Sequence, residues 1–250
     1  MCSQMEVLLE EDKHWWFASR TKAIFAVLAP VVKGAEGLVL DVGSGAGNMF
    51  HHLSRYGPVV GVDNNPKPLL VALKRGYVVP LGRAEALPFP SETFRLIALL
   101  DVIEHCDDDL QVLRECYRVC VPGGFIIITA PAFQWLWSYN DELNRHRRRY
   151  NAGSLKALLE KAGFRSLRIT YNNFFIFPLA VPLILIRERL GLHPDLASPH
   201  FDEDAYQVEM EPVPPILNTI LTSVGELEAW LIRRMNLPFG TSIIALARKI

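Results

Sequence analysis

The sequence has few of the features that mark secreted, metal-stapled or nucleic-acid-binding proteins. Its 250 residues include only four cysteines, and no two of them form a CxxC pair or join histidines at zinc-site spacing. We therefore expect neither a disulfide scaffold nor a bound metal, and a reducing cytosol is the simplest compartment. The net charge of -1 gives no general attraction to nucleic acid or anionic lipid.

Long hydrophobic runs are also missing. No stretch reaches the roughly 20 apolar residues that a membrane-spanning helix needs. The nearest candidate is 174–186, FFIFPLAVPLILI, which is shorter and is interrupted by Pro178 and Pro182. The start of the chain, MCSQMEVLLEEDKHWW, is acidic where a secretory signal would be basic. These features predict a cytoplasmic protein.

What the sequence does contain is a regular alternation of short apolar runs and helical patterns. Half of the residues are hydrophobic, enough for a sizeable core. Such alternation predicts βαβ units and a parallel sheet with helices on both faces. We expect an α/β fold: a three-layer, doubly wound, seven-stranded, mostly parallel sheet with a C-terminal insertion or cap. The strands are expected at 37–41, 59–63, 77–81, 94–101, 125–129, 164–171 and 242–247.

One domain covers the whole chain, 1–250, in this interpretation. It comprises an N-terminal helical cover (1–35), a ligand-binding core (36–172), an apolar and then acidic insertion (173–215), and a final helix and strand (216–250). The proline-rich, acidic stretch 193–215 is expected to be a mobile surface loop or a cap over the site.

The strongest local signal is a glycine cluster at 41–47, DVGSGAG, between an expected strand and an expected helix. Glycines there allow a sharp turn and a close approach of the backbone to a ligand. A dinucleotide site needs its third glycine at position 48, where Asn stands, so the pattern is not the pyrophosphate fingerprint. Asp63, 22 residues after Asp41, ends the next strand and is placed to accept hydrogen bonds from ribose hydroxyls.

Five segments together resemble the class I S-adenosylmethionine-dependent methyltransferases, in particular the type 11 branch. The segments are DVGSGAG (41–47), GVDNN (61–65), GRAEALPFPSETF (82–94), LLDVIEH (99–105) and LRECYRVCVPGG (113–124). The resemblance implies a Rossmann-like fold, S-adenosylmethionine as cofactor and methyl transfer as activity.

The resemblance also assigns cofactor contacts by position. Gly43 and Gly45 are implied to pass under the amino-acid part, and Asp41 and Ser44 of the same loop are also implied cofactor residues. The others are Asp63 and Asn64 at the ribose, Ala84 and Glu85 at the adenine, and Leu100 and Asp101 near the methionine part. Arg83 stands where the family usually has Asp. A guanidinium cannot accept a hydrogen bond, so this position either stacks on the purine or points to solvent.

Two further groups are candidates for the site. In the N-terminal His14-Trp15-Trp16-Phe17 element, Trp16 and Arg20 fall on one helix face. We expect this helix to cover the cofactor, with Arg20 at its carboxylate, although the tryptophans could simply pack the helix on the sheet. The candidates for acid–base chemistry are His105, His146 and Asp141. The arginines at 147–149 either clamp an anionic substrate or pin their own loop.

The sequence therefore predicts a methyltransferase for a small or lipid-like acceptor, with O-methylation favoured and positioning as the main source of catalysis. The alternatives are a non-catalytic, cofactor-binding regulatory protein and an NAD-dependent oxidoreductase. No NPPY-type sequence follows the strand at 94–101, so a nucleic-acid acceptor is not expected. Segment 174–186 completes an apolar pocket as a buried strand and loop, contacts a membrane, or forms a dimer surface. A monomer and a homodimer both remain open.

Overall fold

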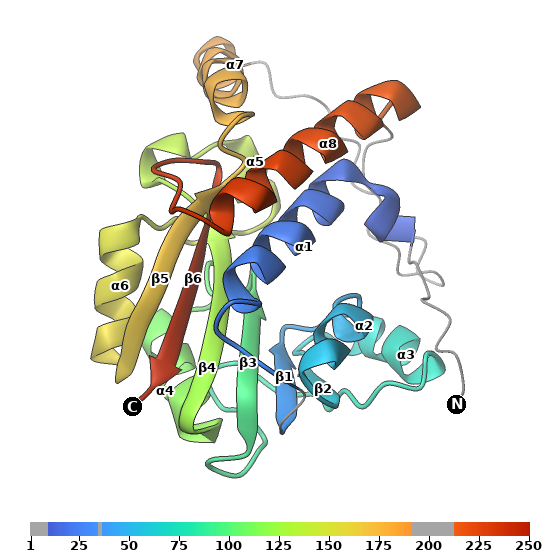
Figure 1. Cartoon of the computed structure of the whole chain (residues 1–250), viewed down its shortest axis with the longest axis vertical. Helices are drawn as coiled ribbons and strands as arrows, with labels where there is room; N and C mark the ends of the chain where they lie inside the picture. Colours follow the sequence, from blue (N-terminus) through green and yellow to red (C-terminus); the bar gives the residue numbers. More distant parts are fainter. Residues whose placement is uncertain (1–9, 35–36, 192–212) are drawn as a thin grey trace.

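The computed structural model describes residues 10–34, 37–191 and 213–250, and a sheet of order β2-β1-β3-β4-β6-β5 forms its centre (Figure 1). Neighbours are parallel from β2 to β4, and β6 is antiparallel to both β4 and β5. The predicted, mostly parallel α/β sheet is confirmed. The strands are β1 (Leu38–Val42), β2 (Val59–Val62), β3 (Phe94–Leu100), β4 (Cys120–Pro131), β5 (Phe164–Asn172) and β6 (Ser242–Lys249).

The prediction of a seventh strand at 77–81 is wrong. The segment runs beside β2, and the N–H groups of Gly61 and Asp63 donate to its carbonyls, yet the only β-bridge described there joins Asp63 to Leu81. Pro80 has no N–H, so it cannot return the hydrogen bond that a parallel ladder needs at this point. The sheet in the described residues therefore has six strands.

Helices cover both faces of the sheet, as Figure 1 shows. Helices α4 and α6 contribute to the core on one face, and α1 and α8 to the core on the other. The helices are α1 (Trp15–Leu28), α2 (Phe50–Leu53), α3 (Pro66–Lys74), α4 (Asp109–Val119), α5 (Tyr139–Leu143), α6 (Ala152–Lys161), α7 (Phe177–Leu190) and α8 (Pro215–Ile232). Short 3-10 turns lie at η1 (Glu10–Lys13), η2 (Ser54–Tyr56) and η3 (Gln134–Leu136).

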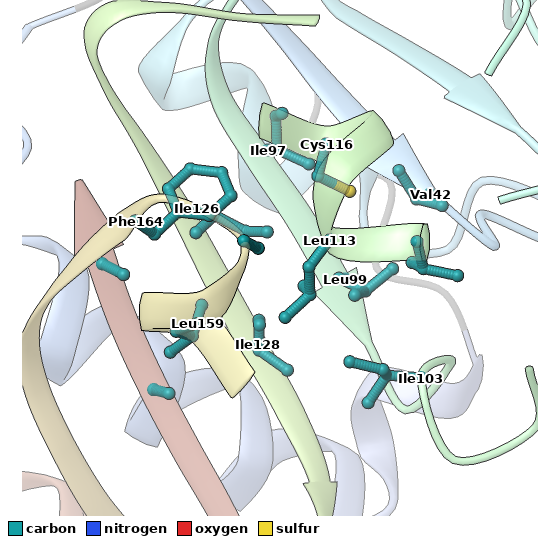
Figure 2. Packing of buried hydrophobic residues seen from close by; sticks show 14 of the residues in the cluster. Val42, Ile97, Leu99, Ile103, Leu113, Cys116, Ile126, Ile128, Leu159 and Phe164 are labelled. Atoms are coloured by element: carbon teal, nitrogen blue, oxygen red, sulfur yellow. The ribbon is translucent and has the colours of Figure 1, made fainter. Parts of the chain in front are cut away.

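Strand β3 supplies both cores because its side chains alternate between the two faces. Ile97 and Leu99 pack toward α4 and α6 (Figure 2), whereas Leu96, Ala98 and Leu100 belong to the cluster under α1 and α8. A strand buried on both faces reads as an unbroken apolar run, which is why FRLIALL could be recognised from the sequence.

Helices α1 and α8 pack closely where Gly225 of α8 meets Ser19 of α1, and a Cβ on Gly225 would overlap the Ser19 side chain. We expect Gly225→Ala to lower the free energy of unfolding by about 1–3 kcal/mol, because this contact has no room for a methyl group. Ser19→Gly in the same chain should restore part of the loss. Thermal melts of both variants, with Ser223→Ala on the exposed side of α8 as control, test this. An unchanged melting temperature for Gly225→Ala would contradict the packing.

Segment 174–186 is not the buried strand and loop that one interpretation predicted. Most of it forms helix α7, which has Pro178 in its first turn, where a missing N–H costs nothing, and Pro182 in its interior. None of the α7 side chains, all of them described, is buried. The predicted acidic loop at 193–215 lies mostly outside the described residues. Among the helices that are described, none is both long and apolar enough to cross a bilayer.

Candidate functional site

The glycine loop leaves the carboxyl end of β1 and turns sharply toward α2. Gly43 and Gly45 have φ angles of 70° and 53°, in the left-handed region that favours glycine. A Cβ on Gly43 would overlap the Val102 side chain, whereas a Cβ on Gly45 would meet nothing within 4 Å. The loop therefore needs glycine at 43 for packing, and at 45 it presents bare backbone to open space.

That open space is a cleft with two lobes, of about 700 Å³ and 480 Å³, whose walls share Gly43, Gly45 and Asp101. The larger lobe lies between the N-terminal helices, the loop and α5, and the smaller one lies beside the ends of β2 and β3. Among the predicted cofactor residues, the larger lobe is lined by Arg20, Asp41, Gly43, Ser44, Gly45, Leu100 and Asp101. The smaller lobe is lined by Gly43, Gly45, Asp63, Asn64, Ala84, Glu85 and Asp101. The structure thus brings every predicted cofactor residue to one cleft.

Asp63 is held in a fixed orientation at the end of β2. The Gly45 N–H donates to its Oδ2 and the Asn65 N–H to its Oδ1, both at 2.8 Å. A carboxylate has about four acceptor positions, so each oxygen retains one for a further donor. The carboxylate therefore suits a ligand with two adjacent hydroxyl groups.

Arg20 reaches the same cleft from α1, beside the ring of Trp16. Its Nη2 lies 2.7 Å from Oδ2 of Asp101, and Thr129 donates to Oδ1 of that carboxylate. Asp101 has a φ of 56°, unusual for a non-glycine residue. Among the described atoms, Nε of Arg20 is buried without a hydrogen-bond partner. Arg20 thus carries a donor that an anionic ligand group in this lobe would satisfy.

Arg83, the departure from the family pattern, lies at the edge of the smaller lobe. Its side chain is 66% exposed, and its Nε lies 3.5 Å from Oε2 of Glu85. Of the two expected alternatives, the exposed position corresponds to the one that points to solvent.

The three candidates for acid–base chemistry come together in the structure. Asp141 is fully buried and contacts Nδ1 of His146 at 2.8 Å, while Arg149 donates to both of its oxygens at 2.8 Å. Burial raises the pKa of Asp141, but the hydrogen bonds from His146 and Arg149 outweigh it and bring the pKa to about 2. An ionised Asp141 favours the His146 tautomer with the proton on Nδ1, which leaves Nε2 able to accept a proton. The ring of His105 packs edge-on against His146 at 4.7 Å and lines the smaller lobe.

Sequence reasoning missed Glu104, the neighbour of His105. Its side chain is buried, and Oε2 has no partner among the described residues. Burial, followed by the nearby Asp101 charge, holds the pKa of Glu104 well above its usual range. One carboxylate oxygen of Glu104 and one nitrogen each of His105 and His146 lie within 4.8 Å of one another. The only sequence signal was a carboxylate four residues after the mostly apolar strand β3.

The arginine run pins its own loop. Arg147 pairs with Asp107 at 2.8 Å, Arg148 with Asp109 at 2.9 Å, and Arg149 with Asp141. Each guanidinium thus has a carboxylate of this chain as partner. Of the two expected roles for 147–149, the contacts correspond to loop pinning.

Comparison with known proteins shows which kind of protein this chain is similar to. The model of a family described as "Methyltransferase domain" matches residues 40–128, the region of the glycine loop and the smaller lobe. A Mycolicibacterium smegmatis protein named "Probable S-adenosylmethionine-dependent methyltransferase" is 30% identical over 158 residues, which cover 61% of this chain and 60% of that protein. Residues 40–128 thus match a methyltransferase domain, and the chain is similar to S-adenosylmethionine-dependent methyltransferases.

Two further relatives extend the comparison. The ubiquinone biosynthesis O-methyltransferase of Aliivibrio fischeri is 33% identical over 112 residues, which cover 40% of this chain and 47% of that enzyme. The chain thus spans about half to three-fifths of the curated relatives it matches. A solved S-adenosylmethionine-dependent methyltransferase of Thermotoga maritima has the same fold, with a TM-score of 0.58, 21% identity and coverage of 94% of this chain and 93% of that one.

The residues of the cleft fit the cofactor of this family, S-adenosylmethionine. The carboxylate of Asp63 suits the two ribose hydroxyls, and the open backbone at Gly45 allows the ligand to come close. The buried Nε–H of Arg20 is a hydrogen-bond donor suited to the carboxylate of the cofactor. Asp63 and Arg20 would hold the two ends of the cofactor from the two lobes. The proximity of Arg20 to Asp101 was not visible in the sequence, since 81 residues separate them.

The buried carboxyl group of Asp41 is expected to make the stability of the protein depend on pH. Burial raises the pKa of Asp41 to about 7, while Arg20 lowers it and Asp63 raises it. Because the folded pKa exceeds the unfolded value near 4, the contribution of Asp41 to stability is complete below about pH 4 and is lost as the pH rises through 7. We expect cofactor-free Asp41→Asn to match the wild type at pH 4 and to exceed its free energy of unfolding at pH 8. Urea titrations at both pH values measure this, and a constant difference between the two proteins would contradict it.

Proposed function

We propose that this methyltransferase transfers a methyl group from S-adenosylmethionine to a small, lipid-like acceptor in the larger lobe. The observation that carries the proposal is the meeting of the two lobes at Gly43, Gly45 and Asp101. Asp63 would hold the sugar of the cofactor, with Asp101 beside it where the two lobes meet, and the bound cofactor would supply the reactive methyl group. The protein contributes alignment of acceptor and methyl group, which lowers the barrier by about 7–11 kcal/mol in well-oriented reactions.

The larger lobe has room and chemistry for an acceptor beside the methionine part of the cofactor. One wall carries the rings of Trp16 and Phe17, and Asn140 and Asn144 of the α5 region lie on another. Aromatic walls bind flat or apolar molecules, and the amides provide directed hydrogen bonds to an oxygen-containing head. This combination supports an acceptor with an apolar body and a polar reactive end.

O-methylation is the reaction that we favour, because a proton-accepting group stands nearby. A hydroxyl acceptor must lose its proton, and His146 is oriented by ionised Asp141 to accept one at Nε2. His105 lines the smaller lobe together with Asp101, which both lobes share, and it packs on His146, so it is the candidate to receive a proton from an acceptor bound where the lobes meet. The relatives named as ubiquinone biosynthesis O-methyltransferases support an O-methylated, lipid-like acceptor.

Helix α7 supports a contact with the membrane that would hold such an acceptor. Leu179, Leu183, Ile186 and Leu190 follow one another at helical spacing and are all at least half exposed. Arg187 and Arg189 lie in the last turn, where they can meet anionic head groups. We expect the protein to float with anionic liposomes.

The liposome experiment has a matched control in α3. Leu183→Glu should reduce flotation at least several-fold, because it places a charge in the apolar stripe of α7. Leu73→Glu makes the same change at an exposed leucine of α3, and flotation should persist. Equal flotation of the two variants, or none by the wild type, would contradict a membrane contact through α7.

Labelled cofactor tests the function itself. Incubation with S-adenosylmethionine carrying a labelled methyl group, a lipid extract and a panel of phenolic acceptors should transfer label to a small molecule. His146→Ala should lower kcat, and its loss should be smaller at high pH, where the acceptor ionises unaided. Tight binding of the cofactor without transfer to any acceptor would favour the regulatory alternative. A thermal shift with NAD and none with S-adenosylhomocysteine would favour the oxidoreductase.

A further inference from the structure

A second cluster of metal-ligating side chains lies at the far edge of the larger lobe, away from Glu104 and His146. Asp12 of η1 contacts His52 Nε2 at 2.8 Å through Oδ1 and His51 Nε2 at 3.1 Å through Oδ2. Adjacent helical residues point about 100° apart, so their side chains do not normally meet. Here the two imidazole rings lie 3.7 Å apart and turn the same nitrogen toward one carboxylate.

The three side chains of this cluster are shielded from solvent and held in fixed orientations. The three side chains are only 12–21% exposed. Nδ1 of His51 is buried without a partner among the described residues, so the orientation of that ring is set at Nε2.

We propose that Asp12, His51 and His52 bind a zinc ion. Two imidazoles and one carboxylate are a common three-ligand set for Zn²⁺, with water in the fourth position. Metal–ligand distances of about 2.0–2.2 Å place neighbouring ligand atoms roughly 3.3 Å apart in a tetrahedron. The two Nε2 atoms lie 2.8 and 3.1 Å from different oxygens of Asp12, and one ligand atom of each residue lies within 4.8 Å of the other two, so side-chain rotations suffice to reach this geometry. Asp12 lines the larger lobe, so the fourth position has a route to solvent.

The ion would join two elements that cover the cofactor cleft. Asp12 belongs to the turn that precedes α1, and the histidines belong to α2, which follows the glycine loop. Met49, immediately before α2, lines the same lobe as Asp12. Zinc at this junction would hold the N-terminal cover against the loop. Zinc and S-adenosylhomocysteine should therefore strengthen each other's binding by the same factor.

The first measurement is zinc binding to the full chain, freed of any histidine tag and treated with a chelator. Isothermal titration calorimetry with Zn²⁺ should give one strong site per chain, and Co²⁺ should give the visible absorption of a four- or five-coordinate site. The double variant His51→Gln/His52→Gln retains amide donors toward Asp12 but removes both imidazoles. It should fold normally and lose zinc affinity at least 100-fold.

His146→Ala is the matched control, because it disrupts the other metal-ligating cluster of the described chain, Glu104, His105 and His146. Zinc affinity should stay within about twofold of the wild type in this variant. Absence of a strong site in the wild type would overturn the proposal. Loss of binding in His146→Ala with retention in the double glutamine variant would overturn it too, because the ion would then belong to the other cluster. The measurement needs no methyl acceptor, so its outcome is independent of the proposed function.

Discussion

Replacing Asp63 with alanine is expected to weaken the binding of S-adenosylhomocysteine at least 100-fold. The carboxylate is aimed by the N–H groups of Gly45 and Asn65, and hydrogen bonds to a charged acceptor contribute about 1.5–3 kcal/mol each. Two ribose hydroxyls lose their acceptor in the variant, and the glycine loop loses its tie to β2. Isothermal titration calorimetry of the purified protein measures the change.

Two variants separate this role from a general charge effect. Glu160→Ala removes an acidic side chain on the exposed side of α6 and should bind S-adenosylhomocysteine as the wild type does. Asp63→Asn keeps the shape, but its amide nitrogen must face one of the two backbone N–H donors, so it should lose most of the affinity as well. Affinity of Asp63→Ala within twofold of the wild type would remove the basis for placing the sugar here.

Replacing Asp141 with alanine is expected to lower the free energy of unfolding by about 3–5 kcal/mol, since it leaves a buried charge without its partner. The side chain of Arg149 is only 10% exposed and has both carboxylate oxygens of Asp141 as acceptors. The N–H of Ser138 also donates to Asp141. A loss of this size should lower the melting temperature by about 10 °C.

The exposed ion pair between Arg147 and Asp107 provides the comparison. Asp107→Ala removes a carboxylate that is 64% exposed, and such pairs contribute about 0–1 kcal/mol. Asp141→Ala with Arg149→Met should be more stable than Asp141→Ala alone, because the unpaired charge is removed. Differential scanning calorimetry of these three variants, each compared with the wild type, measures the differences in melting temperature. Similar melting temperatures for Asp107→Ala and Asp141→Ala would show that the buried network adds little.

The parts of the fold that the sequence predicted are those with a local cause. The run FRLIALL identified β3 because both of its faces are buried, and the glycine spacing at 41–47 identified the loop before its shape was known. The errors also have local causes. Pro80 interrupts the hydrogen-bond ladder of an otherwise strand-like segment, and two prolines in α7 hid a helix that starts at the first of them.

The sequence predicted mainly those site residues that belong to short, local motifs. Apart from Arg20, Ala84 and Glu85, the predicted cofactor residues lie at or just after the carboxyl ends of β1, β2 and β3, so the parallel sheet brings them to one edge without further information. The tie between Arg20 and Asp101, and that between Asp12 and the two histidines, join segments far apart in the sequence. Such pairs depend on how α1 and η1 pack over the sheet. The spacing of apolar residues in the sequence does not predict that packing. The pairing of Asp141 with Arg149 is close in sequence but depends on a buried turn.

Strand β6 lies between β4 and β5, although it is the last strand in sequence (Figure 1). In the sheet, β5 is joined to the other strands only through β6. During synthesis on the ribosome, β5 therefore has no strand to pair with until residues 242–249 have emerged from the exit tunnel. Helix α6, which packs on β5, cannot reach its final position before then. The N-terminal half, with the glycine loop, can assemble earlier, so nascent chains should acquire protease resistance in two stages.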